Sequence, residues 1–332
     1  MKNTFTFLFI LLESFIYGQE FQIKIEGEAQ GTTYHITYFD ATNRDLQPEI
    51  DKILQDFDKS VSTYLTSSII SRINSNAKNV ITDKYFNTCF NKAKEVHRNT
   101  NGAFDPTVYP LVNAWGFGPE KKQKIEKTKI DSILKFVGFD LISLKGNKII
   151  KKDKRVALDF NAFAQGYSVD VVADFLKSKK IINFIVEIGG EVYANGKKPN
   201  GENWSIGIEK PIDNKVNVNP LKAIAKLENL AIATSGNYRR FVIEDGVKYA
   251  HHLDPKTGYP TKNNLLSVSI FSKKCIDSDA NATGILVMGL EKAKEFLANH
   301  KELLAYLIFS DENGNYQIYE TDGLKNIISE TD

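Results

Sequence analysis

The stretch CIDSDANAT, residues 275–283, joins the end of a strand expected at 266–271 to a helix expected near 279–288. Within it, Asp279 and Thr283 stand four residues apart and therefore share one face of that helix. A carboxylate and a hydroxyl near a helix N-terminus are ligands that Mg²⁺ or Ca²⁺ prefers, and phosphate oxygens also bind there. The same pair is typical of a solvated helix cap. The first hypothesis is a metal-assisted reaction on a phosphate ester.

The segments on both sides of this stretch indicate the fold class. The expected strands come in runs with helices interspersed, which favours an α+β fold with largely antiparallel sheets over a doubly wound parallel sheet. Apolar alternation and helical spacing of apolar residues place these elements. The expected strands are 21–25, 34–38, short strands within 141–158, 181–186, 204–208, 221–227, 230–233, 240–244, 266–271, 304–309 and 316–319, and the expected helices are 50–57, 85–96, 129–137, 171–176, 279–288 and 290–299.

Composition limits the kinds of partner. The 332 residues are 42% hydrophobic and 25% charged, enough for one large or two modest globular domains. The 43 basic and 41 acidic residues leave a formal net charge of +2. Because this balance creates no large electrostatic field, small molecules or proteins are expected as partners, rather than nucleic acid or anionic lipid.

The N-terminus predicts export. Lys2 precedes the apolar run 5–12, and Gly18 follows, so residues 1–18 are expected to be a signal peptide that is too short to span a bilayer. Residues 19–332 are expected to form a single domain made of two intertwined subdomains. Export would place the protein in a bacterial-type periplasm or outside the cell. The two cysteines, Cys89 and Cys275, are expected to be buried free thiols.

Two further segments combine features of a ligand site with features of ordinary packing. Residues 102–119, GAFDPTVYPLVNAWGFGP, crowd aromatics, prolines and glycines into a non-periodic stretch, which suits either a rigid loop against a flat aromatic ligand or a packed loop at a domain seam. Residues 158–167, LDFNAFAQGY, are expected to run from a strand into a helix through a turn at Gly166. That junction could hold a cation or phosphate, or Asp159 could be a helix cap.

A fourth constellation pairs residues 233–240, ATSGNYRR, with residues 251–260, HHLDPKTGYP. No other Cys, His or Glu has metal-ligand spacing nearby in the sequence, so a histidine that handles a proton or contacts phosphate is favoured over zinc. Neighbouring residues on a strand point to opposite faces, so His251 and His252 are not expected to enter the same pocket. Phosphate-loop, dinucleotide-binding and serine-hydrolase motifs are not found in the sequence, which disfavours those enzyme classes.

Taken in order, these segments resemble the ApbE family of FAD:protein FMN transferases from about residue 27 to residue 300. The resemblance rests on eight short motifs: 31–34, 62–64, 102–119, 159–170, 187–191, 233–238, 251–260 and 279–283. It implies that FAD lies in an elongated cleft between two α+β subdomains, with Mg²⁺ at its pyrophosphate. It also implies a reaction in which a Thr or Ser hydroxyl of an acceptor protein attacks the phosphorus on the riboflavin side, so that AMP leaves and FMN becomes linked through a phosphodiester.

The resemblance assigns roles to residues by position. Asp279, Thr283 and a backbone oxygen of Ala162 fall on the Mg²⁺ positions, and His251 falls on the family histidine that would move a proton or position phosphate. Gln30 replaces a Met that often packs on the flavin, and Gln165 replaces a frequent Lys or Glu, so one charge is missing from the cleft. The other positions expected to contact FAD are Tyr64, Ala103, Phe104, Asp105, Asp159 and Leu253.

Two other functions remain compatible with these residues. A Mg²⁺-dependent FAD pyrophosphatase would use water in place of the protein hydroxyl and release FMN and AMP. A flavin-binding protein without turnover would leave FAD intact, which Gln30 and Gln165 would make possible. For the transferase, the implied acceptor is a membrane redox subunit, such as one of a sodium-pumping NADH:quinone reductase, or another exported flavoprotein.

Overall fold

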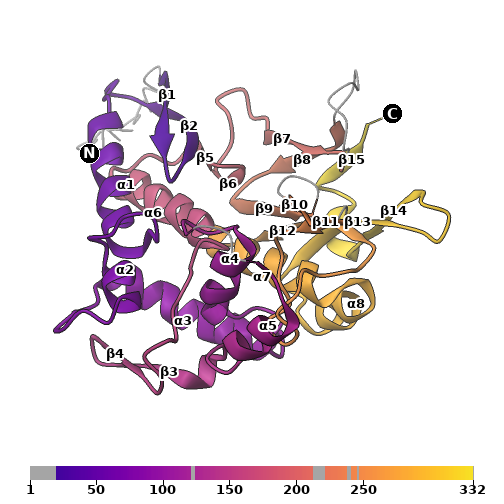
Figure 1. Cartoon of the computed structure of the whole chain (residues 1–332). Helices are drawn as coiled ribbons and strands as arrows, with labels where there is room; N and C mark the ends of the chain where they lie inside the picture. The colour runs from indigo at the N-terminus through magenta and orange to yellow at the C-terminus, as the bar shows by residue number, and fades with distance from the viewer. Residues whose placement is uncertain (1–19, 121–123, 212–220, 238–240, 245–246, 332) are drawn as a thin grey trace, which may run out of the picture.

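The structure, a computed structural model, describes residues 20–120, 124–211, 221–237, 241–244 and 247–331 (Figure 1). The expected signal peptide, residues 1–18, lies outside the described residues. Within them, none of the helices has the length and apolar character needed to cross a membrane. The division of residues 19–332 into two subdomains stays a prediction.

A large antiparallel sheet organises the fold. In the described part of the chain it has eight strands in the order β1-β2-β5-β6-β9-β12-β13-β14. Each neighbouring pair is antiparallel, which confirms the predicted α+β class with largely antiparallel sheets. The strands are β1 (Phe21–Ala29), β2 (Thr32–Asp40), β5 (Phe184–Ile188), β6 (Glu191–Asn195), β9 (Leu230–Gly236), β12 (Leu265–Ser272), β13 (Leu304–Ser310) and β14 (Tyr316–Glu320).

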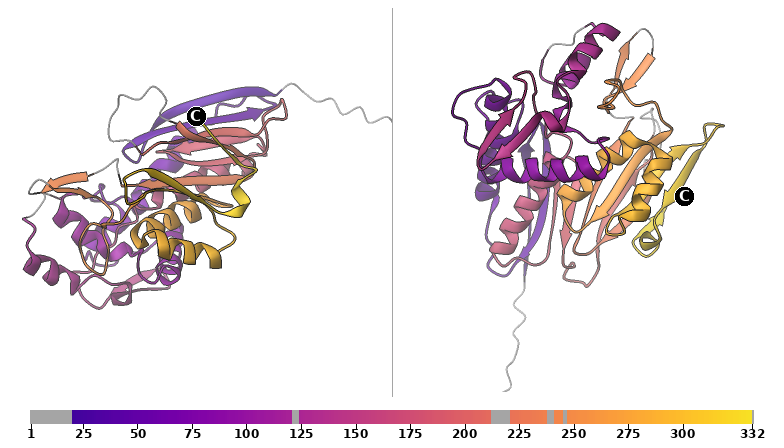
Figure 2. Two further views of the ribbon diagram at one scale, coloured as in Figure 1. Left: turned by 90° about the vertical axis from the view of Figure 1, so that its right-hand side faces the viewer. Right: turned by 90° about the horizontal axis from the view of Figure 1, so that it is seen from below.

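Three helices cover one face of this sheet, and a smaller sheet covers the other (Figure 2). Apolar residues of α6 (Ala164–Ser178) pack on the β1–β2 hairpin and β5, and those of α7 (Cys275–Met288) and α8 (Leu290–Asn299) pack on β12 and β13. On the opposite face, Trp204, Ala223 and Leu227 pack against Val192 and Tyr306 of the large sheet. The smaller sheet consists of β15 (Ile328–Glu330), β8 (Leu221–Leu227) and β7 (Trp204–Glu209).

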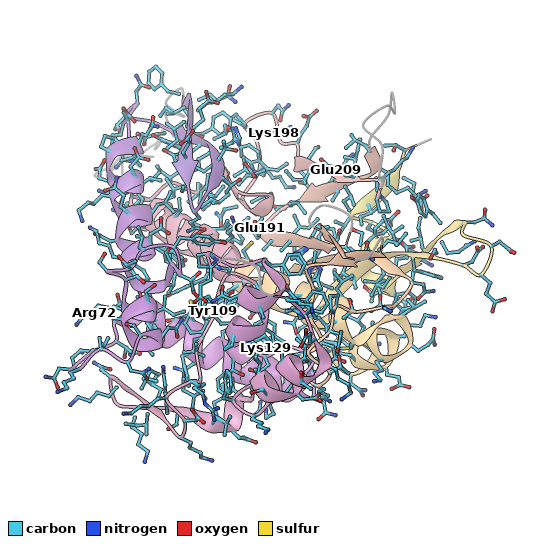
Figure 3. The ribbon with its side chains drawn as sticks, viewed as in Figure 1. Arg72, Tyr109, Lys129, Glu191, Lys198 and Glu209 are labelled. Atoms are coloured by element: carbon cyan, nitrogen blue, oxygen red, sulfur yellow. The ribbon has the colours of Figure 1, made fainter. Side chains whose placement is uncertain are left out.

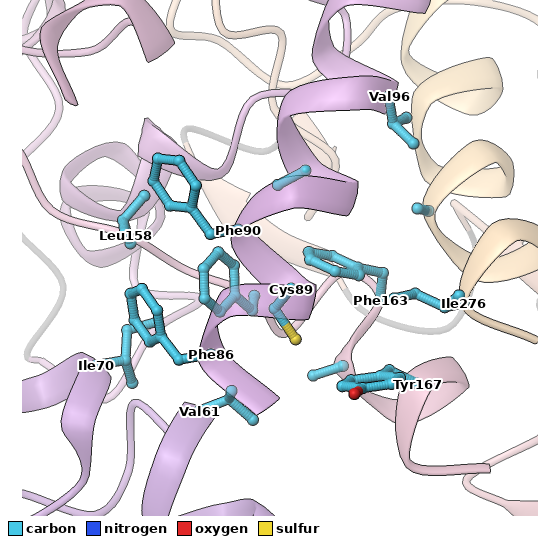
Figure 4. Packing of buried hydrophobic residues seen from close by; sticks show 14 of the residues in the cluster. Val61, Ile70, Phe86, Cys89, Phe90, Val96, Leu158, Phe163, Tyr167 and Ile276 are labelled. Atoms are coloured by element: carbon cyan, nitrogen blue, oxygen red, sulfur yellow. The ribbon is translucent and has the colours of Figure 1, made fainter. Parts of the chain in front are cut away.

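The remaining helices form a further layer, mainly over α6 and α7, and Ile50 and Leu54 of the first of them also pack on the β1–β2 hairpin. The core between these layers is aromatic: Phe86 and Cys89 of α3 pack toward Phe163, Tyr167 and Ile276 (Figure 4). This layer contains α1 (Gln47–Val61), α2 (Ile69–Asn74), α3 (Lys84–Asn99), α4 (Tyr109–Trp115), α5 (Lys127–Leu134) and the hairpin β3 (Ile142–Lys145) to β4 (Lys148–Lys151). Short 3₁₀ helices lie at Pro106–Val108, Phe139–Leu141 and Asp322–Leu324, and a separate hairpin joins β10 (Phe241–Glu244) to β11 (Val247–Ala250).

Most predicted elements are present, with differences at their ends. The strand expected at 181–186 begins at Phe184, and the helix expected near 279 begins four residues earlier, at Cys275. Both cysteines are buried and free, as predicted. The periodicity of apolar residues locates an element well, whereas its ends depend on capping contacts from other parts of the chain.

Candidate functional site

The contact between α6 and α7 forms the floor of the candidate site. The backbone N–H of Gly166 donates to Asp279 Oδ2 at 2.9 Å. A Cβ atom on Gly166 would lie 2.6 Å from both Asp279 Cβ and the carbonyl oxygen of Cys275, so only glycine allows the helices to approach this closely. Burial raises the pKa of Asp279 to about 7 against the opposing effect of the Gly166 hydrogen bond. A buried carboxylate of this kind is a natural ligand for a cation.

Neutral oxygens converge beside Asp279. Thr283, one turn further along α7, donates its hydroxyl to the carbonyl oxygen of Ala162 at 3.2 Å. The hydroxyl of Ser235, on β9, lies 3.3 Å from Thr283 Oγ1. The structure therefore brings together the three predicted metal-binding residues, which come from segments more than 100 positions apart, and adds Ser235.

Helix α7 does not begin at Asp279, and Asp279 is not a solvated cap. The helix begins at Cys275, and Asp279 lies in its second turn with 7% of its surface exposed. The carboxylate of Asp170, on α6, accepts from the N–H groups of Cys275 at 2.8 Å and Ile276 at 3.0 Å. Asp170 therefore satisfies the first two N–H groups of the helix, and the next two donate to the carbonyl oxygen of Lys274, so this end is closed to a phosphate.

The segment 102–119 is partly helical, where the sequence predicts a loop. Pro106 and Pro110 lie in the first turns of a 3₁₀ helix and of α4, positions that tolerate a missing N–H. Asp105 is buried, and its carboxylate accepts from Thr107 N at 2.8 Å and from Phe139 N at 3.1 Å. The Asp105 side chain thus holds the segment in place while the segment itself lines the site.

The segment 158–167 also differs from its prediction. Residues 156–160 form no strand, and Gly166 lies inside α6 rather than in a turn. Asp159 does not cap that helix, because its Oδ1 accepts from Asn161 N at 2.7 Å in a local turn. Burial raises the pKa of Asp159 to about 6. The turn leaves the carbonyl oxygen of Ala162 beside Thr283.

Both histidines of the pair line the same cavity, which contradicts the expectation from strand alternation. Their ring centroids lie 3.9 Å apart, and His251 also approaches the ring of Phe117 at 6.2 Å. Strand β11 ends at Ala250, so the two residues do not follow the alternation of a strand. Burial holds the pKa of His252 well below its ordinary value, so this ring stays neutral.

All these segments border one cleft of about 820 Å³, a volume within the range of cofactor sites. At one end, Gln30 lies in the two-residue turn between β1 and β2 with φ of 55°, in the left-handed region that such turns require. Tyr64 is 59% exposed at the mouth. The cleft is lined by all the residues assigned from the sequence: Gln30, Tyr64, Ala103, Phe104, Asp105, Asp159, Ala162, Gln165, His251, Leu253, Asp279 and Thr283.

Sequence reasoning missed several polar residues of the cleft. Asp58 in α1, Ser235 in β9 and Glu191 at the start of β6 also line it, and Glu191 is labelled in Figure 3. Glu191 and Ser235 lie within the family motifs 187–191 and 233–238, and this could have identified them as cleft residues. Asp58 follows Phe57 in an amphipathic helix, where a single acid carries no pattern of its own.

Comparisons with known proteins identify the family of this chain. The ApbE family matches residues 30–308. The "FAD:protein FMN transferase" of Haemophilus influenzae is 38% identical over 307 residues, covering 88% of each chain, and that of Vibrio cholerae serotype O1 is 36% identical over 318 residues, covering 93% of each.

Solved structures give the same result. The flavin transferase ApbE from Vibrio cholerae superposes with a TM-score of 0.84 at 34% identity, covering 93% of this chain and 99% of that one. The apo flavinyl transferase ApbE of Pseudomonas stutzeri has a TM-score of 0.83 at 30% identity, covering 93% and 97%. The resemblance predicted from eight short motifs is thus confirmed, and the chain belongs to the ApbE family.

Proposed function

We propose that this protein is an FAD:protein FMN transferase. In this reaction the pyrophosphate of FAD is cleaved, FMN is attached through a phosphodiester to a Thr or Ser of an acceptor protein, and AMP is released. The observation that carries the proposal is the convergence, in one 820 Å³ cleft, of residues from all the assigned positions between Gln30 and Thr283. Relatives that match along nearly the whole chain have this name.

We further propose that the cleft binds Mg²⁺ through Asp279, Thr283 and the carbonyl oxygen of Ala162. All three are hard oxygen donors, and the distance of 3.2 Å between Thr283 Oγ1 and Ala162 O supports a shared ligand sphere. Among the described residues, no group of three or more His, Cys, Asp or Glu side chains could hold a metal ion. A single carboxylate with neutral oxygens suits Mg²⁺, which usually completes its sphere with water and substrate phosphate. When bound, Mg²⁺ would neutralise charge on the pyrophosphate and make phosphorus more electrophilic.

The protein's own residues have three tasks in this reaction. The cleft must hold FAD so that the incoming hydroxyl, the phosphorus and the leaving oxygen lie in line, because positioning supplies much of the rate in phosphoryl transfer. His251, on the cleft wall, is proposed to position phosphate or transfer a proton. A base is needed because the pKa of an alcohol lies far above neutral.

The proposed location and partner follow from the N-terminal stretch and the family. We propose that the protein is exported to a bacterial-type periplasm and modifies a membrane redox subunit or another exported flavoprotein. Cell fractionation, with N-terminal sequencing of the mature chain, tests export. Recovery of a chain that still begins at Met1 in the cytoplasmic fraction would contradict it.

The assay for the function uses purified protein, FAD, MgCl₂ and the soluble domain of a candidate redox subunit. Flavin fluorescence on the denatured acceptor and stoichiometric AMP release are expected. Asp279→Ala should lower the rate at least about 100-fold, since it removes the one proposed metal carboxylate. Asp277→Ala is the matched control, because that carboxylate pairs with Lys92 and does not line the cleft.

The same assay separates the alternatives. AMP release without labelling of any acceptor would favour an FAD pyrophosphatase. Intact FAD in the presence of Mg²⁺ would favour a flavin-binding protein without turnover. Labelling that persists at the wild-type rate in Asp279→Ala would remove that residue from the proposed metal site.

A further inference from the structure

Asp58 is an accessible carboxylate that has no partner in the cleft among the residues that the structure describes. It lies in the last turn of α1, is half-buried and lines the cavity. Within the part of the chain that the structure describes, its carboxylate makes no hydrogen bond or ion pair, and burial alone raises the pKa of Asp58 to about 6. A half-buried carboxylate that has a raised pKa and faces a cleft is a candidate for a functional role.

The other acids that line the cleft are already engaged. Asp105 accepts from Thr107 and Phe139, and Asp159 accepts from Asn161. Asp279 accepts from Gly166 and belongs to the proposed metal site. Glu191 is buried at the start of β6, and it already interacts with another group of the protein. Among the described residues, Asp58 is the one of these acids whose carboxylate accepts no hydrogen bond and forms no ion pair, so both of its oxygens can face a substrate.

The loop that follows Asp58 forms part of the open side of the cleft. The lining residues that are well exposed are Gly31, Tyr64, Leu65, Asn161 and Ala162. The side-chain amide of Asn161 donates to Thr63 Oγ1 at 3.0 Å, which fastens the loop after Asp58 to the residue before Ala162. A folded acceptor protein cannot enter a cleft of 820 Å³, so its hydroxyl must arrive over this rim. These exposed residues at the rim therefore lie between the end of α1, which carries Asp58, and the carbonyl oxygen of Ala162, which is proposed to bind the metal.

We propose that Asp58 is the general base that takes the proton from the incoming hydroxyl. This rests on the proposed function. As the hydroxyl oxygen bonds to the phosphorus on the FMN side, its proton moves to a carboxylate oxygen of Asp58. The bond between that phosphorus and the bridging oxygen breaks, and AMP leaves with the electron pair. Asp58 then releases the proton to solvent, and His251 is left to position phosphate.

The chemistry of the site suits this role. A general base works best when its pKa lies near the working pH, since it is then mostly ionised yet still attracts a proton strongly. A carboxylate with a pKa of about 6 meets this condition better than an exposed aspartate. An ion pair with a nearby cation would lower the pKa of Asp58, and none is present among the described residues.

The test compares Asp58→Ala and Asp58→Asn with the wild-type protein. With FAD, MgCl₂ and an acceptor domain that the wild type labels, single-turnover labelling is expected to fall about 100- to 10,000-fold in both variants. FAD affinity, measured by quenching of flavin fluorescence, is expected to stay within about threefold of the wild type, since a general base acts on the hydroxyl rather than on FAD binding. Added formate or acetate should restore Asp58→Ala in proportion to its concentration but not Asp58→Asn, whose amide still fills the site. Asp56→Ala, an exposed acid on the same helix paired with Lys52 and Lys59, is the matched control.

Three results would overturn the proposal. One is a wild-type rate in Asp58→Ala, and another is a loss of rate that neither acid restores. The third is a loss that follows weakened FAD binding alone, which would make Asp58 a binding residue. If the wild type neither labels an acceptor nor releases AMP, the proposed function itself fails, and the role of Asp58 falls with it.

Discussion

The acids of this cleft show how single residues of one type acquire different roles from their partners. Asp105 has its carboxylate committed to the N–H groups of Thr107 and Phe139 and therefore has a structural role. Asp279 accepts one N–H and faces neutral oxygens, which suits a cation. Asp58 has no described partner and is available to a substrate. Neighbouring donors, rather than residue identity, decide each role.

Asp40, outside the cleft, gives a prediction about acid stability. Its Oδ2 accepts from Thr42 Oγ1, Arg44 N and Arg44 Nε at 2.8–2.9 Å, and Oδ1 accepts from Arg44 Nη2 at 2.8 Å. The Arg44 hydrogen bonds hold the pKa of Asp40 well below its ordinary value. A lowered pKa stabilises the fold above the unfolded pKa of about 4, and this stabilisation is lost as the pH falls through the folded pKa.

We therefore expect Asp40→Asn to lower the free energy of unfolding by about 2 kcal/mol at pH 7, since charged hydrogen bonds are replaced by neutral ones. The difference from the wild type should narrow steadily as the pH is lowered below about 4. Urea unfolding of both proteins between pH 7 and pH 2.5 measures it. A difference that stays constant over this range would show that the charge of Asp40 contributes nothing.

At the scale of elements, the site depends on how closely α6 approaches α7. Gly166 permits the contact, and Asp170 caps the N-terminus of α7 from the same helix. These interactions join residues more than 100 positions apart in the sequence. They fix the position of Asp279 on α7 relative to Ala162, which precedes α6. A change in this spacing would move the proposed metal carboxylate without altering it chemically.

Gly166→Ala tests this spacing. The added Cβ would lie 2.6 Å from Asp279 Cβ and from Cys275 O, so the helices must separate. We expect the free energy of unfolding to fall by about 1–3 kcal/mol. AMP release should fall more than this loss of stability explains, because Asp279 is displaced. Asp174→Ala, at an exposed site on α6, is the control and should change neither quantity. Wild-type activity in Gly166→Ala would mean that the spacing is not critical.

At the scale of the whole molecule, the cleft exists only when its separate parts pack together. Its walls come from the β1–β2 turn, the end of α1, the segments 102–119 and 158–167, β9, the segment after β11, and α7. A ligand that binds this assembled cleft therefore binds the native state and not the unfolded chain. Such binding stabilises the fold by mass action.

ADP carries a pyrophosphate and lacks the flavin, so it probes the proposed metal site without turnover to FMN. At about 100 times its dissociation constant, ADP should stabilise the protein by about 2.7 kcal/mol. We expect the rise in Tm to be larger with MgCl₂ than with EDTA. In Asp279→Ala the difference between the two conditions should disappear. An equal rise with and without Mg²⁺ in the wild type would argue against a metal at the pyrophosphate.

Much of the fold and site could be predicted from local patterns. Alternation and helical spacing located the strands and helices, because the burial of one face imposes a period of 2 or 3.6 residues on each element. The spacing of Asp279 and Thr283 placed them on one helix face. The predictions for 102–119, for 158–167 and for the two histidines were wrong in their local structure. In those segments, contacts such as Asp105 with Phe139 override local preference.

What the sequence by itself determined is most of the longer helices and strands, the antiparallel α+β class, the family and many of the residues that line the cleft, but not the elements α2, α4 and β6. Only the tertiary structure decided that α7 begins at Cys275, that Asp170 caps it, that Ser235 lies beside Thr283 and that Asp58 has no partner among the described residues. The physical reason is the range of the interactions. Periodicity acts over a few residues, whereas these contacts form only after packing brings distant helices and strands together.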